Sequence, residues 1–211
     1  MKIKKIDIKK DMKVKELIEE FSKSGVLGSG RVSKATELLT DMIRDDQTKV
    51  FLSLAGPLVP GGMRNIVSQM IKDKQIDVLI TSGANITHDL LEAFGGSHYS
   101  GMGFDDEDLN QEGIGRIGDV YTKNHDFEVF EKEITKIFQE IHNSSSKDPR
   151  IISIKDLLNE IGSRITDENS ILKAAHDNGV HIYAPGIIDS MLGLQLWMFT
   201  QENNFVLDAI G

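Results

Sequence analysis

The feature that most constrains the fold is an apolar strand, a helix and a second apolar strand in succession between residues 49 and 82. "KVFLSLAG" and "IDVLITS" are short apolar runs, and "GGMRNIVSQMIKD" between them has helical spacing. Two buried strands joined by a helical crossover are typical of a parallel sheet. We therefore predict an α/β protein with a doubly wound, mostly parallel, Rossmann-like sheet and helices on both faces.

The remainder of the chain fits one α/β domain over residues 1–211. The basic amino terminus predicts a strand followed by a helix, and further amphipathic helices are expected at about 32–44 and 127–141. Glycine-rich, acidic residues 95–119 predict an ordered loop over the sheet edge, with disorder as the alternative. After residue 150 we expect two helices, the first with a capping-box-like start and the second ended by Gly179. A strand, a turn at Pro185 and Gly186, and a nearly all-apolar, buried helix follow.

Composition excludes several classes of protein and of site. The 211 residues contain no cysteine, which excludes disulfides and thiolate metal sites and favours a cytoplasmic protein. The six histidines show no HExxH-like pairing, so no metal site is predicted. A formal charge of −9 disfavours nucleic-acid binding and suits a cationic ligand, although acidic charge often serves solubility alone. The most apolar segment is interrupted by glycines and prolines, so no membrane helix is expected.

Three predicted strands end in small, turn-forming residues: "LAGPLVPGG" at 54–62, "TSGANITHD" at 81–89 and "APGIIDS" at 184–190. The carboxyl ends of parallel strands lie at one edge of a sheet, where ligands bind in the crevice. Small residues allow the backbone to approach a ligand, and the helix amino termini beyond them suit phosphates. The pattern therefore predicts a nucleotide site, although glycines and prolines can also merely terminate strands. The GxGxxG fingerprint is absent.

Several polar residues in these turns have two interpretations. Asn85 is well placed to cap a helix that begins at Ile86, with Asp89 near the positive end of that helix. His88 could face the crevice and bind a ligand, or only cover the surface. Asp189 follows the third strand, where a buried carboxylate would need a donor or a cation, and we place it in the crevice.

In chain order, six motifs together resemble deoxyhypusine synthase: "SGVLGSGRVSKATELL", "VFLSLAGPLVPGGMR", "VLITSGANITHDL", "HYSG", "NQEGIGRIGDVY" and "IYAPGIIDSMLG". The resemblance covers nearly the whole chain and points to a divergent, deoxyhypusine-synthase-like branch. It implies a doubly wound α/β subunit of a homotetramer that binds NAD and spermidine. NAD would oxidise spermidine, and the aminobutyl group would pass through an imine on an enzyme lysine to a lysine of the hypusine-carrying translation factor precursor.

The resemblance also implies site residues. The loop Gly56, Pro57, Leu58, Val59 and Pro60 matches the family's first NAD-binding turn, Ser82, Gly83 and Ala84 match its second, and Asp189 matches an acidic residue that contacts NAD. Thr87 and His88 stand where the family has two glutamates that serve spermidine and cofactor, and Leu194 replaces an aspartate that grips the polyamine. These departures leave the spermidine contacts open, because a buried ammonium needs compensating charge.

The family continues for about another hundred residues beyond the segment that matches "NNFVLDAIG", and that part carries the imine-forming lysine. No catalytic residue is therefore assigned, and a fragment of a longer protein is expected. The leading interpretation is NAD-dependent aminobutyl transfer of the deoxyhypusine synthase type. Homospermidine-type transfer to a small amine and an inactive partner subunit of an active paralogue are the alternatives.

Overall fold

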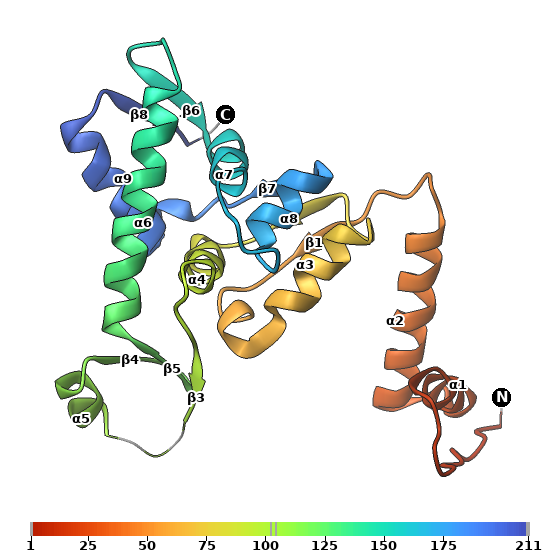
Figure 1. Ribbon diagram of the computed structural model, residues 1–211. Helices are drawn as coiled ribbons and strands as arrows, with labels where there is room; N and C mark the ends of the chain where they lie inside the picture. The colour runs from red at the N-terminus through yellow and green to blue at the C-terminus, as the bar shows by residue number, and fades with distance from the viewer. Residues whose placement is uncertain (1, 102, 104, 210–211) are drawn as a thin grey trace. The chain divides into compact units, whose positions relative to one another are not determined.

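The computed structural model describes residues 2–101, 103 and 105–209, which form two compact units with the boundary between Val50 and Phe51. Each unit has its own secondary structure and is described by itself below (Figure 1). A single domain over residues 1–211 stays a prediction.

The amino-terminal unit is a pair of packed helices, α1 (Val14–Ser24) and α2 (Leu27–Arg44). Gly25 ends α1 in the left-handed conformation with φ of 65°, and a side chain on Gly30 would lie only 2.4 Å from the Gly25 backbone. The predicted strand at the amino terminus is wrong, since residues 2–9 form no strand. The backbone N–H of Asp7 instead donates to the Glu20 carboxylate of α1 at 3.2 Å, in place of a ladder hydrogen bond.

A parallel sheet organises the second unit, as the β-α-β pattern predicts. Its strands follow the spatial order β1 (Phe51–Ser53), β2 (Val78–Ile80) and β7 (His181–Tyr183), and all pairs are parallel. Ser53 pairs with Ile80, and Ile80 pairs with Tyr183, so the three strands end level with one another. The mixed α/β class with parallel pairing is confirmed, and the doubly wound, Rossmann-like description stays a prediction.

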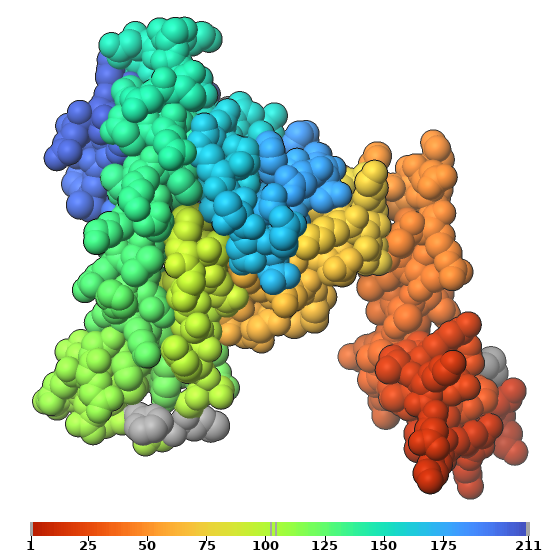
Figure 2. Space-filling model, in the orientation of Figure 1, coloured from red at the N-terminus to blue at the C-terminus, as the bar shows by residue number. Residues whose placement is uncertain are grey.

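Helices pack around this sheet. The turn η1 (Val59–Met63) and α3 (Arg64–Lys72) connect β1 to β2, and α4 (Gly83–Ala93) follows β2. The long helix α6 (Asn124–Asn143) packs against α4, as the apolar spacing of 127–141 predicts. α8 (Ile171–Asn178) lies beside α3, and the two adjoin in Figure 2. The largest fully buried side chains come from these elements, from β2 and from α7 (Ile154–Gly162): Ile71, Leu79, Ile86, Leu90, Leu91, Phe130, Ile134, Phe138, Ile141, Leu157, Leu158 and Ile161.

The acidic stretch 95–119 is more regular than a loop. Apart from positions 102 and 104, which lie outside the described residues, it contains β3 (Tyr99–Ser100), α5 (Asp106–Gln111) and β4 (Ile114–Ile117). β4 pairs antiparallel with β5 (Val120–Lys123), and β5 also pairs with β3. Gly118, with φ of 65°, allows the two-residue turn between β4 and β5.

The carboxy-terminal part departs from the sequence prediction in its strands and in the exposure of its last helix. β6 (Arg150–Ser153) and β8 (Phe205–Asp208) form a separate parallel pair, and α9 (Met191–Glu202) precedes β8. α9 was expected to be buried, but Leu194, Trp197 and Met198 are each about half exposed. Among the described residues α9 contacts α4, α6, residues 187–189 and β8, and these neighbours leave the three side chains partly uncovered. No helix in the described ranges is both long and apolar enough to cross a membrane.

Candidate functional site

The three turns that follow β1, β2 and β7 meet at one edge of the parallel sheet, as the sequence predicts. Asn85 joins the first turn to the second: its Oδ1 accepts from the Val59 N–H at 3.2 Å, and its Nδ2 donates to the Ala55 carbonyl and, at 3.0 Å, to Thr81 Oγ1. The expectation that Asn85 caps a helix starting at Ile86 is wrong. Ser82 is the N-cap, accepting from the Asn85 N–H at 3.3 Å, because α4 begins three residues earlier.

The second turn also contacts the third. A side chain on Gly83 would lie 2.5 Å from Ser190 Oγ and 2.8 Å from the Ile187 Cα, so only glycine fits there. The turn η2 (Ile187–Asp189) therefore packs directly on the first residue of α4. Gly83 serves this protein contact, whereas Gly56 has more room, since a Cβ atom added to it would lie 3.4 Å from Ser82 Oγ.

A cleft of about 370 Å³ opens beside these turns, within the range of small-ligand sites. It brings together four of the sequence-predicted residues, which are Ala84, Thr87, His88 and Asp189. Its remaining walls come from β4, β5, α6 and the start of α9: Gly115, Arg116, Ile117, Thr122, Phe127, Ser190 and Met191. The loop 56–60, Ser82, Gly83 and Leu194 do not line this cleft, although Ser82 and Gly83 adjoin it in the chain.

Sequence reasoning missed the β4–β5 wall, and with it the cation Arg116. The Arg116 guanidinium is held by both carboxylate oxygens of Asp106, at 2.6 and 2.8 Å. The signal that could have found this wall is "RIGDVY", in which Gly118 and Asp119 separate two short runs of strand-forming residues. Arg116 and Asp189 place one cation and one anion on the rim of the same cleft.

His88 lies in the cleft wall and is the first member of a chain of hydrogen bonds that ends at the partly exposed Glu92. Its Nδ1 is 2.9 Å from His98 Nε2, and His98 Nδ1 is 2.7 Å from Glu92 Oε1. Only 7% of His88 is exposed, and the Phe127 ring stands edge-on to it. Burial, followed by repulsion from His98, lowers the pKa of His88 to about 4, although Glu92 acts in the opposite direction. His88 is therefore neutral at physiological pH.

Thr87 and Asp189 differ in how free they are to bind a ligand. The Thr87 hydroxyl donates to the Gly83 carbonyl at 3.0 Å and accepts from the Leu192 N–H at 3.2 Å, so it holds the first turn of α9. Asp189 is exposed at the end of η2, with its carboxylate on the cleft rim. The binding roles expected of both residues stay predictions.

Asp89, next to His88, has a role that its sequence neighbourhood does not indicate. It is fully buried and accepts four hydrogen bonds, from Arg64 Nε at 2.7 Å, Ser170 Oγ at 2.8 Å and the backbone N–H groups of Ile171 and Leu172 at 3.0 and 3.1 Å. The Asp89 carboxylate thus lies at the amino terminus of α8 and stabilises the positive end of that helix, and not only its own helix, α4. Burial alone would lower the pKa of Arg64, but Asp89 and Asp167 raise it.

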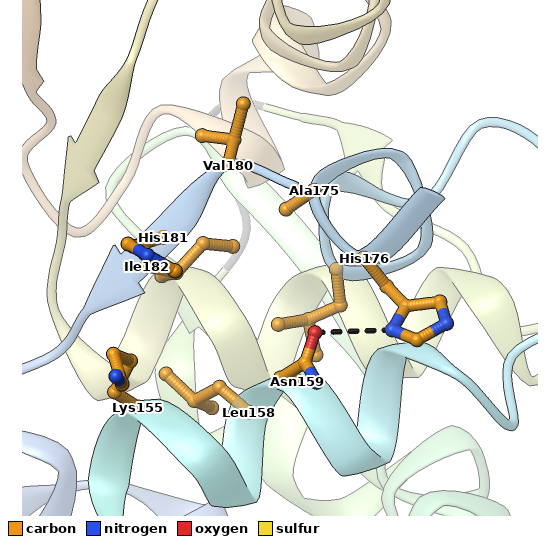
Figure 3. A pocket seen from close by; sticks show the side chains of 9 residues that line it. Lys155, Leu158, Asn159, Ala175, His176, Val180, His181 and Ile182 are labelled. Carbon is orange, nitrogen blue, oxygen red and sulfur yellow. Dashed lines mark hydrogen bonds between the residues drawn. The ribbon is translucent and has the colours of Figure 1, made fainter. Parts of the chain in front are cut away.

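Figure 3 shows a second, much smaller cavity between α7, α8 and β7. His176 Nδ1 and Asn159 Oδ1 pair across it at 3.0 Å, and its volume of about 20 Å³ holds roughly one water molecule. His181 begins β7, so this cavity lies at the amino end of the strand, away from the turns that form the cleft. Within the described residues, no group of three or more His, Asp or Glu side chains could hold a metal ion.

Comparison with known proteins identifies the family. The deoxyhypusine synthase family model matches residues 16–211. The chain belongs to the deoxyhypusine synthase family. A probable deoxyhypusine synthase from Methanothermobacter thermautotrophicus is 58% identical over 210 residues, which is 100% of this chain and 67% of that protein. A probable deoxyhypusine synthase from Methanosarcina thermophila is 38% identical over 208 residues, covering 98% of this chain and 63% of its own.

The fold of a solved structure agrees with this family assignment. The crystal structure of an Entamoeba histolytica protein assigned to deoxyhypusine synthase matches with a TM-score of 0.69 and 17% identity, over 98% of this chain and 70% of that one. At this identity the likeness shows the fold alone. The chain thus has a deoxyhypusine synthase fold and spans about two thirds of the length of these relatives.

Proposed function

We propose that the chain supplies the amino-terminal part of the active site of a deoxyhypusine synthase, an NAD-dependent aminobutyl transferase. Spermidine, or a related polyamine, would be the donor. The acceptor would be a lysine of the hypusine-carrying translation factor precursor, reached through an imine on the enzyme in a doubly wound subunit of a cytoplasmic homotetramer. Family membership supports the reaction class, and the cited relatives, named as deoxyhypusine synthases, do not favour a small-amine acceptor or an inactive partner.

The observation that carries the proposal is the cleft beside the strand ends. Four residues chosen from the sequence, Ala84, Thr87, His88 and Asp189, line one cavity although about a hundred positions separate the first three from the last. The neutral ring of His88 and the carboxylate of Asp189 both accept hydrogen bonds, which is what an amine or ammonium group requires.

The residues present also fit part of NAD. Ala84 lies in the first turn of α4, where backbone N–H groups lack helical partners and attract phosphate oxygens, and Arg116 adds a cation to the β4–β5 wall of the same cleft. The loop 56–60 adjoins this end of α4 through the Val59–Asn85 hydrogen bond, which supports a role for the loop in binding a ligand longer than the cleft. When bound, NAD would supply the hydride acceptor for amine oxidation.

Binding of NAD and spermidine, measured by calorimetry on the full-length protein, tests the proposal. Asp189→Asn should weaken binding of spermidine or NAD about tenfold, because a charge-assisted hydrogen bond becomes a neutral one. Asp73→Asn, at the exposed end of α3, is the matched control and should change neither affinity. Equal dissociation constants for the wild type and Asp189→Asn would remove Asp189 from the site, and no binding of either ligand would refute the assignment of the cleft.

A further inference from the structure

A chain of hydrogen bonds leads from the partly exposed Glu92 through His98 to His88 in the cleft wall. The family resemblance implies two glutamates at positions 87 and 88 instead of this arrangement. Its two links measure 2.7 Å between Glu92 Oε1 and His98 Nδ1, and 2.9 Å between His98 Nε2 and His88 Nδ1. Both rings are buried, with 7% of His88 and 5% of the His98 side chain exposed. Hydrogen bonds of this length between buried rings favour one nitrogen of each ring as the carrier of its proton.

The order of donors along the chain follows from Glu92. A carboxylate only accepts, so His98 Nδ1 carries a proton and donates it to Glu92. When His98 carries this one proton alone, its Nε2 is unprotonated and accepts from His88 Nδ1–H. A neutral His88 with its proton on Nδ1 has a lone pair on Nε2, and no described residue hydrogen-bonds to that nitrogen.

We propose that Glu92 and His98 are positioning residues that hold His88 in the tautomer with an unprotonated Nε2 in the cleft, so that His88 accepts the proton of a bound amine. The inference rests on the proposed function for the identity of the amine. Its chemical reason is that an ammonium nitrogen has no lone pair, whereas oxidation next to nitrogen and attack on an imine both need one.

The proton balance of the step is closed. The amine N–H bond breaks and a bond from that proton to His88 Nε2 forms, while the His88 Nδ1–H bond breaks and a His98 Nε2–H bond forms. The products are a neutral amine, a neutral His88 in the opposite tautomer, and a cationic His98 beside the Glu92 carboxylate. His88 itself never has to hold a positive charge in its buried position.

The charged groups around His88 suit this direction of transfer. Glu92 compensates the charge that arrives on His98, and Arg64 Nη1 lies 3.6 Å from the second Glu92 oxygen and fixes it. In the β4–β5 wall of the cleft, the Arg116 cation, which is paired with Asp106, still disfavours a second positive charge nearby, while the exposed Asp189 carboxylate attracts an amine from solvent. Phe127 adds no charge, but its ring covers His88 edge-on.

Nitrogen-15 NMR of the histidine rings in this chain, at about pH 8 and with spermidine as the probe, tests the relay. We expect protons on His88 Nδ1 and His98 Nδ1 in the free chain. Added spermidine should move the His88 Nε2 resonance towards that of a protonated nitrogen. Glu92→Gln, whose amide can also donate to His98, should mix the two tautomers and raise the dissociation constant for spermidine about tenfold.

The chain offers a matched control, because exposed His125 and Glu128 form a second histidine–glutamate pair at 3.2 Å outside the cleft. Glu128→Gln should leave the His88 resonances and the spermidine affinity unchanged. If His88 carries its proton on Nε2 in the ligand-free chain, the proposed relay is wrong, irrespective of the effect of spermidine. If the tautomers are as expected but spermidine moves no resonance of the cleft, the polyamine function and the amine as proton donor are refuted together, while the positioning of His88 stands.

Discussion

Asp89→Asn should destabilise the second unit, because it weakens the hydrogen bonds that Asp89 accepts at the amino terminus of α8. Asparagine has nearly the same size and shape as aspartate, so the packing around position 89 should not change. Asp89 Oδ1 accepts from Arg64 Nε and the Ile171 N–H, while Oδ2 accepts from Ser170 Oγ and the Leu172 N–H. Asparagine replaces one oxygen by an NH₂ group. The least costly orientation keeps the amide oxygen at the Oδ1 position and lets the Ser170 hydroxyl rotate to accept, which leaves the Leu172 N–H without its acceptor.

The magnitude follows from this loss. One buried N–H without a partner costs about 1–3 kcal/mol, and the bond to Arg64 loses its charge assistance. Arg64 is 7% exposed and would be a nearly uncompensated buried cation, but Asp167 still binds its Nη1 at 2.7 Å. Removing one partner of a buried pair costs about 3–5 kcal/mol, so with this second carboxylate we expect the lower end, about 3 kcal/mol.

Urea unfolding followed by circular dichroism provides the assay. With an m-value of about 2 kcal/mol/M, the urea concentration at the unfolding midpoint should fall by roughly 1.5 M. Hydrogen exchange should accelerate most at the amides of Ile171 and Leu172. Asp167→Asn, which alters the half-buried partner of the same Arg64, is the control and should cost about 1 kcal/mol. Equal losses in the two variants, or a loss below about 1 kcal/mol for Asp89→Asn, would refute the stabilising role of Asp89 at the amino terminus of α8.

Three further predictions concern the turns and the cleft. Gly83→Ala should lower the midpoint temperature of thermal unfolding, because its methyl group would overlap Ser190 Oγ. Gly56→Ala should leave that temperature unchanged. Equal midpoint temperatures for the two variants in differential scanning calorimetry would contradict the packing of Gly83. Asn85→Ala should lower the free energy of unfolding in urea by about 2 kcal/mol and loosen the first turn, because the Val59 N–H loses a buried acceptor. An unchanged rate of hydrogen exchange at the Val59 amide would count against the contact between Asn85 and the first turn. The low pKa of His88, about 4 in the folded chain against about 6.5 unfolded, gives a stability contribution that is complete above pH 6.5 and is lost as pH falls to 4. This contribution to the free energy of unfolding is roughly 3 kcal/mol. If the stability of a His88→Gln chain falls as steeply between pH 6.5 and pH 4 as that of the wild type, another group is responsible.

The sequence predicted the parallel strands and their convergent turns because both signals are local. Apolar runs of strand length, small residues after each run and a helical segment between them need no knowledge of the partner. The strand at the amino terminus was predicted from its own residues alone, but a strand also needs a neighbour, and the Asp7 N–H donates to the Glu20 side chain instead. The β4–β5 hairpin was missed because the glycines of 95–119 were interpreted as a loop, although Gly118 is the turn residue that a short hairpin requires.

The polar residues of α4 show why a site cannot be assigned from helix position alone. Successive residues of a helix point about 100° apart, so Thr87, His88 and Asp89 face three different neighbours. All three are buried, and each must therefore find a partner: Thr87 binds the first turn of α9, and Asp89 binds Arg64 and the first turn of α8. These contacts occupy the hydrogen-bonding groups of the Thr87 and Asp89 side chains. His88 uses one ring nitrogen for His98 and lines the cleft, so it is the residue of the three with a polar atom left for a ligand. Adjacent residues of the same motif thus divide into two that hold the fold and one that can carry chemistry.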